Sequence, residues 1–191
     1  AKHYNLFKLE TGMIYRLIGK MRLKNPKRFN YLSVKKKIRN LKINNLGNTN
    51  LLSDKIATSA SIVARDKKIR DIVHKFQQKC AYDPPKKYAG SVLDGRDITS
   101  VILKDAMFKF YITADINVRA RRRYKEYKSL KKDISFKEVL KSLKIRDKSD
   151  KTRKYGPLKK TKDSILLNNS KLSKTACFKK IKAIMDRKIK A

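Results

Sequence analysis

The chain has 191 residues, enough for one α/β domain with a small insertion, and its 40% hydrophobic content can bury a core. Its formal net charge of +36 comes from 52 Lys and Arg against 16 Asp and Glu, which favours a polyanionic partner over a membrane surface. Two distant cysteines, Cys80 and Cys177, and two isolated histidines, His3 and His74, argue against a disulfide scaffold, a zinc ribbon or any metal site.

The first half of the chain predicts one strand followed by helices. Residues 5–10 alternate apolar and polar side chains, as a short strand does, and Thr11-Gly12 breaks the pattern. Apolar residues then recur at helical spacing from residue 13 to residue 21, and this helix ends near Pro26. Further predictions are a basic helix over 31–43, a loop over 44–53 and a largely helical segment over 56–79 with Ile62, Ile69, Val73 and Phe76 as its apolar stripe.

The second half predicts strands that alternate with helices. Residues 92–93 and 107–113 are predicted to form strands, and residues 118–128 are predicted to form a very basic helix. Ser135 and Glu138 have the spacing of a capping box at the start of the next helix. Residues 165–167 predict a last strand, and Ser173 caps a final helix whose inward residues are Cys177, Ile181, Ile184 and Met185. This alternation predicts an α/β fold with a parallel sheet flanked by helices.

Two ionic clusters outline a pocket for nucleotide phosphates. Arg96 follows a short apolar strand and stands between Asp94 and Asp97. The second cluster consists of Arg146, Asp147, Asp150 and Arg153. Guanidinium groups present a planar fork to phosphate oxygens, although an ordinary ion-pair network is the alternative for Arg96. The sequence contains no G-x-x-x-x-G-K-[ST] loop for donor phosphates.

Six motifs follow one another over nearly the whole chain: Leu9-Glu-Thr-Gly-Met-Ile-Tyr-Arg16, Ala60-Ser-Ile-Val-Ala64, Leu93-Asp-Gly-Arg-Asp97, Arg119-Ala-Arg-Arg-Arg-Tyr124, Ser135-Phe-Lys-Glu-Val-Leu140 and Arg146-Asp-Lys-Ser-Asp-Lys-Thr-Arg153. Their order and spacing resemble bacterial-type cytidylate kinase, a nucleoside-monophosphate kinase. The resemblance implies one nucleoside-monophosphate-kinase-like domain over 1–191, with a short insertion over 17–60 and a lid-like region over 121–153.

The resemblance also implies a CMP-binding pocket. Its ten positions would be Thr11, Tyr15, Arg16, Ser61, Arg70, Arg96, Asp97, Arg146, Asp150 and Arg153. In an active enzyme Arg96, Arg146 and Arg153 would be catalytic, with ATP and Mg²⁺, because several arginines can neutralise a phosphoryl group in transfer. A packing role is the alternative for Tyr15.

One departure from the family concerns the start of the chain. The family begins with a strand and a Gly-rich loop that holds the donor phosphates, whereas Ala1-Lys-His-Tyr resembles the tail of the helix after that loop. The first strand and the P-loop are therefore expected to be missing, and no cofactor is expected for the chain as given. Because the family places that strand between those matching 91–93 and 107–113, we expect another segment or chain to fill the gap.

The charge and the absent loop favour a catalytically inactive, basic RNA-binding structural component, such as a mitochondrial ribosomal protein bound to rRNA. The expected RNA contacts are Arg119, Arg121, Arg122, Arg123, Lys125 and Lys128. Aromatic residues among lysines could stack on bases: Tyr4, Phe7, Phe29, Tyr31, Tyr124 and Tyr127.

The sequence also permits functions without an RNA partner. The surviving pocket positions fit an active (d)CMP kinase that phosphorylates CMP or dCMP with ATP, its P-loop missing from the 191 residues. A module that binds CMP without phosphorylating it is a third hypothesis. Biased codon composition could supply many of the lysines, and a cytoplasmic location is the alternative to a mitochondrial one.

Overall fold

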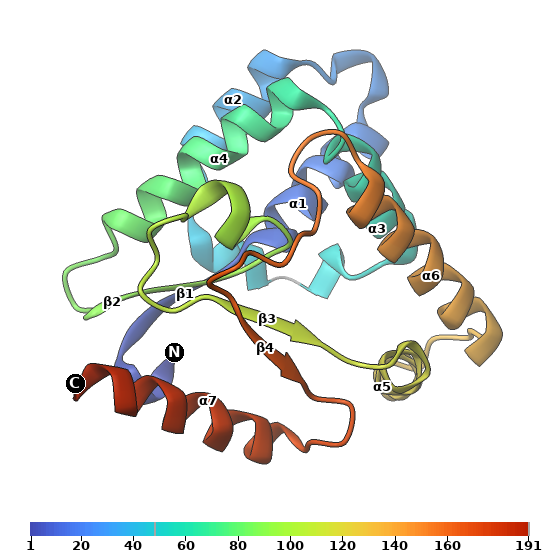
Figure 1. The fold of residues 1–191 in the computed structure, drawn as a ribbon. Helices are drawn as coiled ribbons and strands as arrows, with labels where there is room; N and C mark the ends of the chain where they lie inside the picture. Colours follow the sequence, from blue (N-terminus) through green and yellow to red (C-terminus); the bar gives the residue numbers. More distant parts are fainter. Residues whose placement is uncertain (48, 191) are drawn as a thin grey trace. The chain divides into compact units, whose positions relative to one another are not determined.

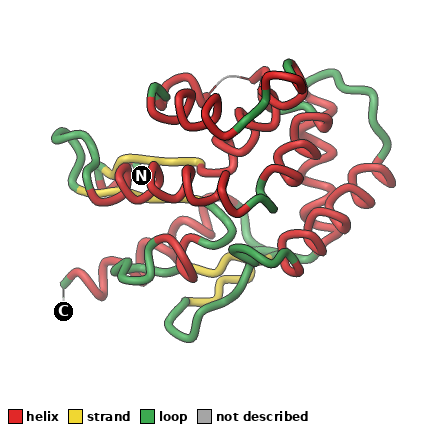
Figure 2. The backbone as a smooth tube through the Cα atoms, turned by 90° about the horizontal axis from the view of Figure 1, so that it is seen from above, coloured by secondary structure: helices red, strands yellow, loops and turns green. Residues whose placement is uncertain are grey.

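The computed structural model describes residues 1–47 and 49–190 (Figure 1). The chain forms two compact units: residues 1–104 with 149–159, and residues 105–148 with 160–191. Helices make up most of both units, and the strands are short (Figure 2).

The first unit contains a two-stranded parallel sheet. Strand β1 (Leu6–Glu10) pairs with β2 (Gly90–Asp94), with Glu10 opposite Asp94, so both strands end at the same edge. The predicted strand over 5–10 is thereby confirmed. Helix α1 (Thr11–Lys24) starts directly after β1, and a π-helical turn, η5 (Ile98–Ile102), follows shortly after β2. This arrangement brings the start of α1 and the loop after β2 together.

Helices pack around this sheet to form the larger hydrophobic core. Helix α1 lies against α3, and Gly19 permits the approach, since a Cβ there would lie 2.7 Å from the backbone nitrogen of Ala60. Leu9, Ile14 and Ile18 are completely buried in this core. The other bounds are η1 (Lys2–Tyr4), η2 (Pro26–Arg28), α2 (Tyr31–Arg39), η3 (Ile43–Gly47), η4 (Thr49–Leu51), α3 (Asp54–Val63) and α4 (Lys67–Tyr82).

Two expectations for this unit need correction. Residues 56–79 are two helices rather than one, because Asp66 leaves the helical path and caps α4 by accepting from the backbone N–H of Ile69 at 3.0 Å. Ile62 does not belong to the apolar stripe, since it is 45% exposed while Val63 is buried. Within the predicted loop over 44–53, the described residues form the 3₁₀ turns η3 and η4, and residue 48 lies outside the described residues.

The second unit contains the other parallel pair, β3 (Phe110–Thr113) and β4 (Ile165–Asn168). Strand β3 starts later than predicted, and Met107 is 67% exposed. The long helices are α5 (Ile116–Ser129), α6 (Phe136–Thr152) and α7 (Lys174–Ile189), and the last four residues of α6 count with the first unit.

The predicted helix starts in this unit are confirmed. Ser135 Oγ accepts from the Glu138 N–H at 3.2 Å, and Glu138 accepts from the Ser135 N–H at 2.8 Å, which is a capping box. Ser173 caps α7 by accepting from the Ala176 N–H at 3.1 Å. The residues expected to face inward on α7 are only half-buried: Cys177, Ile181, Ile184 and Met185.

The α/β class with parallel pairing is confirmed, but the sheet is divided. Across residues 1–47 and 49–190, β2 pairs with β1 alone and β3 with β4 alone. What lies along the second edges of β2 and β3 stays a prediction. No helix in the described part of the chain has the length and apolarity needed to cross a membrane.

Candidate functional site

The candidate site starts where β1 and β2 end. Thr11, the first residue of α1, is buried and donates its hydroxyl to the carbonyl of Asp94, the last residue of β2, at 2.6 Å. Arg96 and Asp97 follow on the loop after β2, and Tyr15 lies one turn into α1. The chain thus places four of the predicted positions on the two segments that leave this edge of the sheet.

Five charged side chains form a continuous network in the first unit, with alternating signs. Arg70 Nη2 donates to Asp97 Oδ2, and Asp97 Oδ1 lies 4.0 Å from Arg153 Nη2. Arg153 Nη1 donates to Asp150 Oδ1 at 3.2 Å, and Asp150 Oδ2 accepts from Arg96 Nε at 3.0 Å. The order is therefore Arg70, Asp97, Arg153, Asp150 and Arg96, in which each carboxylate bridges two guanidinium groups.

Most of this network is removed from water. The side chains of Arg70, Asp97 and Arg153 are only 2%, 6% and 6% exposed, whereas Arg96 is 42% exposed. Burial acts to raise the pKa of Asp97, but the positive charges of Arg70 and Arg153 act in the opposite direction, and the pKa lies below its ordinary value. Burial, followed by the charge of Arg70, lowers the pKa of Arg153. Three cations thus share two anions, which leaves a net positive site for an anionic group.

Buried donors in the network lack protein partners. Neither the Tyr15 hydroxyl nor Arg70 Nε has a hydrogen-bond partner among the described residues. The Tyr15 ring packs 5.6 Å from the Arg70 guanidinium carbon, and burial raises the pKa of Tyr15 strongly, so its hydroxyl stays protonated. Because an unsatisfied buried donor is costly, both groups fit a site that a polar ligand completes.

Gly156 allows the segment after α6 to reach the network. Its φ is +55°, in the left-handed region, and a Cβ there would overlap the guanidinium of Arg70. Its carbonyl accepts from Arg153 Nε at 2.7 Å, which fixes the Arg153 side chain.

The remaining predicted positions are less closely connected. Arg16 Nη1 donates to the carbonyl of Leu51 at 2.7 Å, and Ser61 bonds within its own helix to Ala57 at 3.2 Å. Arg146 is half-buried and belongs to the second unit, whereas the other nine positions belong to the first. Membership of all ten residues in a CMP-binding pocket stays a prediction.

His74 joins the network although the sequence alone did not place it there. It lies one turn after Arg70 on α4, and its Nε2 is 3.2 Å from Arg70 Nη2 and 3.3 Å from Asp97 Oδ2. In the sequence it stands alone, because the only other histidine, His3, is far from it along the chain. The i, i+4 spacing from Arg70 was the signal that could have placed it.

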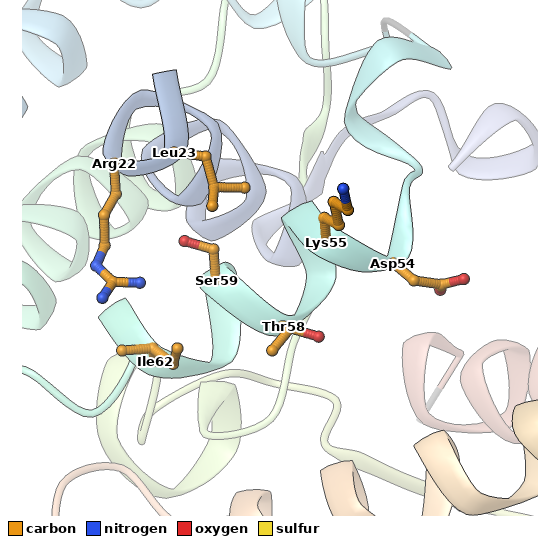
Figure 3. Close-up of a pocket in the computed structure, with 7 residues that line it drawn as sticks. All are labelled: Arg22, Leu23, Asp54, Lys55, Thr58, Ser59 and Ile62. Carbon is orange, nitrogen blue, oxygen red and sulfur yellow. The ribbon is translucent and has the colours of Figure 1, made fainter. Parts of the chain in front are cut away.

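A separate hollow of about 420 Å³ lies between α1 and α3 (Figure 3). Arg22 and Leu23 line it from α1, and five residues from Asp54 to Ile62 line it from α3. None of the ten predicted pocket positions belongs to it, so it is not the site that the arginines form.

The basic helix α5 uses several of its arginines within the second unit. Arg119 binds both carboxylate oxygens of Asp147, at 3.0 and 2.6 Å, and Arg122 donates to the side chain and backbone of Asn169 at 2.9 and 2.8 Å. Arg123 donates to Glu126 at 2.8 Å. Arg121, Lys125 and Lys128 are exposed. These three residues are therefore the better candidates for contact with an anionic polymer. Contact with RNA stays a prediction for all six residues that the sequence analysis proposed.

Two of the aromatic residues expected to stack on bases are core residues instead. Phe7 and Tyr127 are 7% and 4% exposed, because each fills the hydrophobic core of its unit. The other four are exposed or half-buried: Tyr4, Phe29, Tyr31 and Tyr124.

Comparison with known proteins gives one consistent result. A family model described as cytidylate kinase matches residues 1–187. A cytidylate kinase of Clostridium botulinum (strain Loch Maree / Type A3) is 38% identical over 194 residues, covering 96% of this chain and 87% of the relative. Cytidylate kinases of Bartonella henselae and Bartonella quintana are 36% and 37% identical, covering 100% of this chain and 87% of each relative.

Proposed function

The chain belongs to the cytidylate kinase family, and we propose that the protein transfers the terminal phosphoryl group of ATP to CMP or dCMP. The observation that supports this proposal most is the buried network of Arg70, Asp97, Arg153, Asp150 and Arg96. Its excess positive charge suits a monophosphate, and its carboxylates hold the guanidinium forks in place before the ligand arrives.

We assign described residues to the acceptor side of this reaction. Arg96 and Arg153 would bind the acceptor phosphate and stabilise the charge on the transferring group. A role for Arg146 rests on the family resemblance alone. Asp150 and Asp97 would orient these arginines. ATP and Mg²⁺ enter the proposal from the family alone, and we assign no residue to either of them.

The experiment is an assay of the native protein with ATP and each of CMP, dCMP and UMP. We expect CDP and dCDP to form. Arg153→Lys should lower kcat/KM at least tenfold, because lysine cannot bond the Gly156 carbonyl and Asp150 at once as the guanidinium of Arg153 does. The matched control is Arg39→Lys at the exposed end of α2. Absence of CDP above background would reject the transferase; CMP binding without turnover would favour the CMP-sensing hypothesis.

RNA binding is a second candidate, favoured by the net charge of +36. The hypothesis of an inactive ribosomal component finds no support in the comparisons, since the relatives named above are bacterial cytidylate kinases. The same holds for a mitochondrial location. We therefore propose RNA binding only as a property additional to kinase activity. The salt dependence of the affinity for RNA tests it.

A further inference from the structure

His74 touches both members of the buried Arg70–Asp97 pair through a single atom. Its Nε2 lies 3.2 Å from Arg70 Nη2 and 3.3 Å from Asp97 Oδ2. The imidazole is 18% exposed, so water does not replace these contacts easily. One nitrogen cannot serve both partners at once, because it accepts from Arg70 only without a proton and donates to Asp97 only with one.

The neutral ring with its proton on Nδ1 leaves fewer buried donors of Arg70 without an acceptor. Arg70 Nη2 carries two hydrogens, one for Asp97 Oδ2 and one for a second acceptor, while Nη1 donates to the carbonyl of Ala64 at 3.1 Å. With His74 as that second acceptor, the terminal nitrogens of Arg70 are held by three acceptors. The buried Nε is then the donor that remains for a ligand.

We propose that neutral His74 is a positioning residue of the nucleotide pocket, which accepts from Arg70 and thereby presents the Arg70 Nε–H to an acceptor atom of the bound nucleotide. This inference rests on the proposed function for the identity of the ligand. Protonation of His74 would turn its Nε2–H toward Asp97 and place a second cation beside Arg70, so the guanidinium would lose this support.

The charged surroundings of His74 can be named. On α4 they are Arg70, Asp71 and Lys75, and Asp97 faces the ring from the loop after β2. The other elements packed against α4 include α2, whose cations are exposed, β2, whose Asp94 is exposed, and η5, which has no charged residue. Arg153 lies on the far side of Asp97, with its Nη2 4.0 Å from Asp97 Oδ1. Arg70 and Asp97 are thus the partners that decide the position of the proton.

The first arm of the test is independent of any nucleotide. The chain has only two histidines, so a His3→Gln variant leaves the ring signals of His74 alone in a ¹⁵N NMR spectrum. At pH 8 we expect the proton on Nδ1 and a bare Nε2. A proton on Nε2 of the neutral ring would overturn the assignment.

The second arm measures CMP affinity by calorimetry for the native protein, His74→Gln, His74→Leu and the His3→Gln control. We expect Leu to weaken binding about tenfold, whereas Gln, which can still accept a hydrogen bond, stays within about threefold. Equal losses for Gln and Leu, or none, would overturn the positioning role.

The two arms separate this inference from the proposed function. If the native protein does not bind CMP, the proposed function fails. In that case the ring tautomer still tests the contact between His74 and Arg70. A proton on Nδ1 would support this contact, and a proton on Nε2 would exclude it.

Discussion

At the scale of single residues, the stability of the first unit depends on the buried charges of Arg70 and Asp97, which compensate one another. Arg70 and Asp97 are almost fully buried, and neither has access to bulk water. Removing one member of a buried ion pair is more damaging than removing both, because the remaining charge has lost its compensation. The residues of the candidate site therefore also contribute to the stability of the fold.

Asp97→Asn tests this dependence. We expect a loss of about 3 kcal/mol in the free energy of unfolding at neutral pH, because Arg70 is left buried without its carboxylate. The pKa of Asp97 is lowered in the folded protein, so its charge contributes stability above the ordinary pKa of aspartate. That contribution disappears as pH falls through the folded pKa, and the difference between the native and variant proteins should shrink there.

Urea unfolding from pH 7 downward measures both effects. The matched control is Asp71→Asn, which removes an exposed carboxylate that pairs with Lys67 at 2.8 Å on the same helix. Solvent screens that pair, so its loss should change stability little. A difference between native and Asp97→Asn proteins that grows in acid would contradict the assigned direction.

Gly156→Ala should destabilise the protein for two reasons that act together. Residue 156 has a φ of +55°, which L side chains adopt at a cost, and the new Cβ would overlap the Arg70 guanidinium. We expect a loss of about 2 kcal/mol or more by thermal or urea unfolding, together with weaker CMP binding. Gly12→Ala is the control, because nothing lies within 4 Å of its Cβ position and it is helical; this variant should be neutral or slightly stabilising.

At the scale of elements, the short break between α3 and α4 positions Arg70. Asp66 ends the break as the N-cap of α4, and its second carboxylate oxygen accepts from the Tyr31 hydroxyl of α2 at 2.9 Å. One side chain therefore fixes both where α4 begins and how it meets α2.

Asp66→Ala should cost about 1 to 2 kcal/mol of unfolding free energy, because the first turn of α4 loses its cap. Asp66→Asn should remain close to the native value, since asparagine caps helices equally well. Chemical denaturation of the three proteins provides the comparison. Equal losses in Ala and Asn would mean that the negative charge, rather than the cap, matters at this position.

The elements that the sequence predicted well are those with a local signal. Apolar alternation identified β1, and capping residues identified the starts of α6 and α7. The break at Asp66 was missed because the surrounding apolar residues continue at helical spacing, and only the cap distinguishes two helices from one. The division of the sheet follows from pairing between distant strands, which no local pattern reports.

The site shows the same limit. Motif order predicted residues of the network but not their pairing, since Arg96 bonds Asp150 rather than its sequence neighbours Asp94 and Asp97. His74 was missed for the same reason, because its contact with Asp97 exists only once α4 lies beside the loop after β2. Sequence thus identifies the charged groups, and the fold decides which of them meet.

At the scale of the whole molecule, the net charge of +36 gives any anionic polymer an electrostatic attraction that no single residue controls. We expect single-stranded RNA of mixed sequence to bind with a dissociation constant of about 10⁻⁴ to 10⁻⁶ M at physiological salt, as non-specific complexes do. The logarithm of the affinity should fall linearly with the logarithm of salt concentration, because each phosphate contact releases counterions.

Charge reversal on α5 tests where the polymer lies. Arg121→Glu with Lys125→Glu changes two exposed cations at i, i+4 spacing and should reduce the salt slope by about 1 to 1.5, since each lost contact removes about 0.7. Lys75→Glu with Lys79→Glu makes the same change on exposed positions of α4 and is the matched control. Fluorescence anisotropy over a salt series measures both slopes. A larger effect from α5 would assign the contact to that helix, whereas equal effects would mean that the total charge attracts RNA without a preferred face.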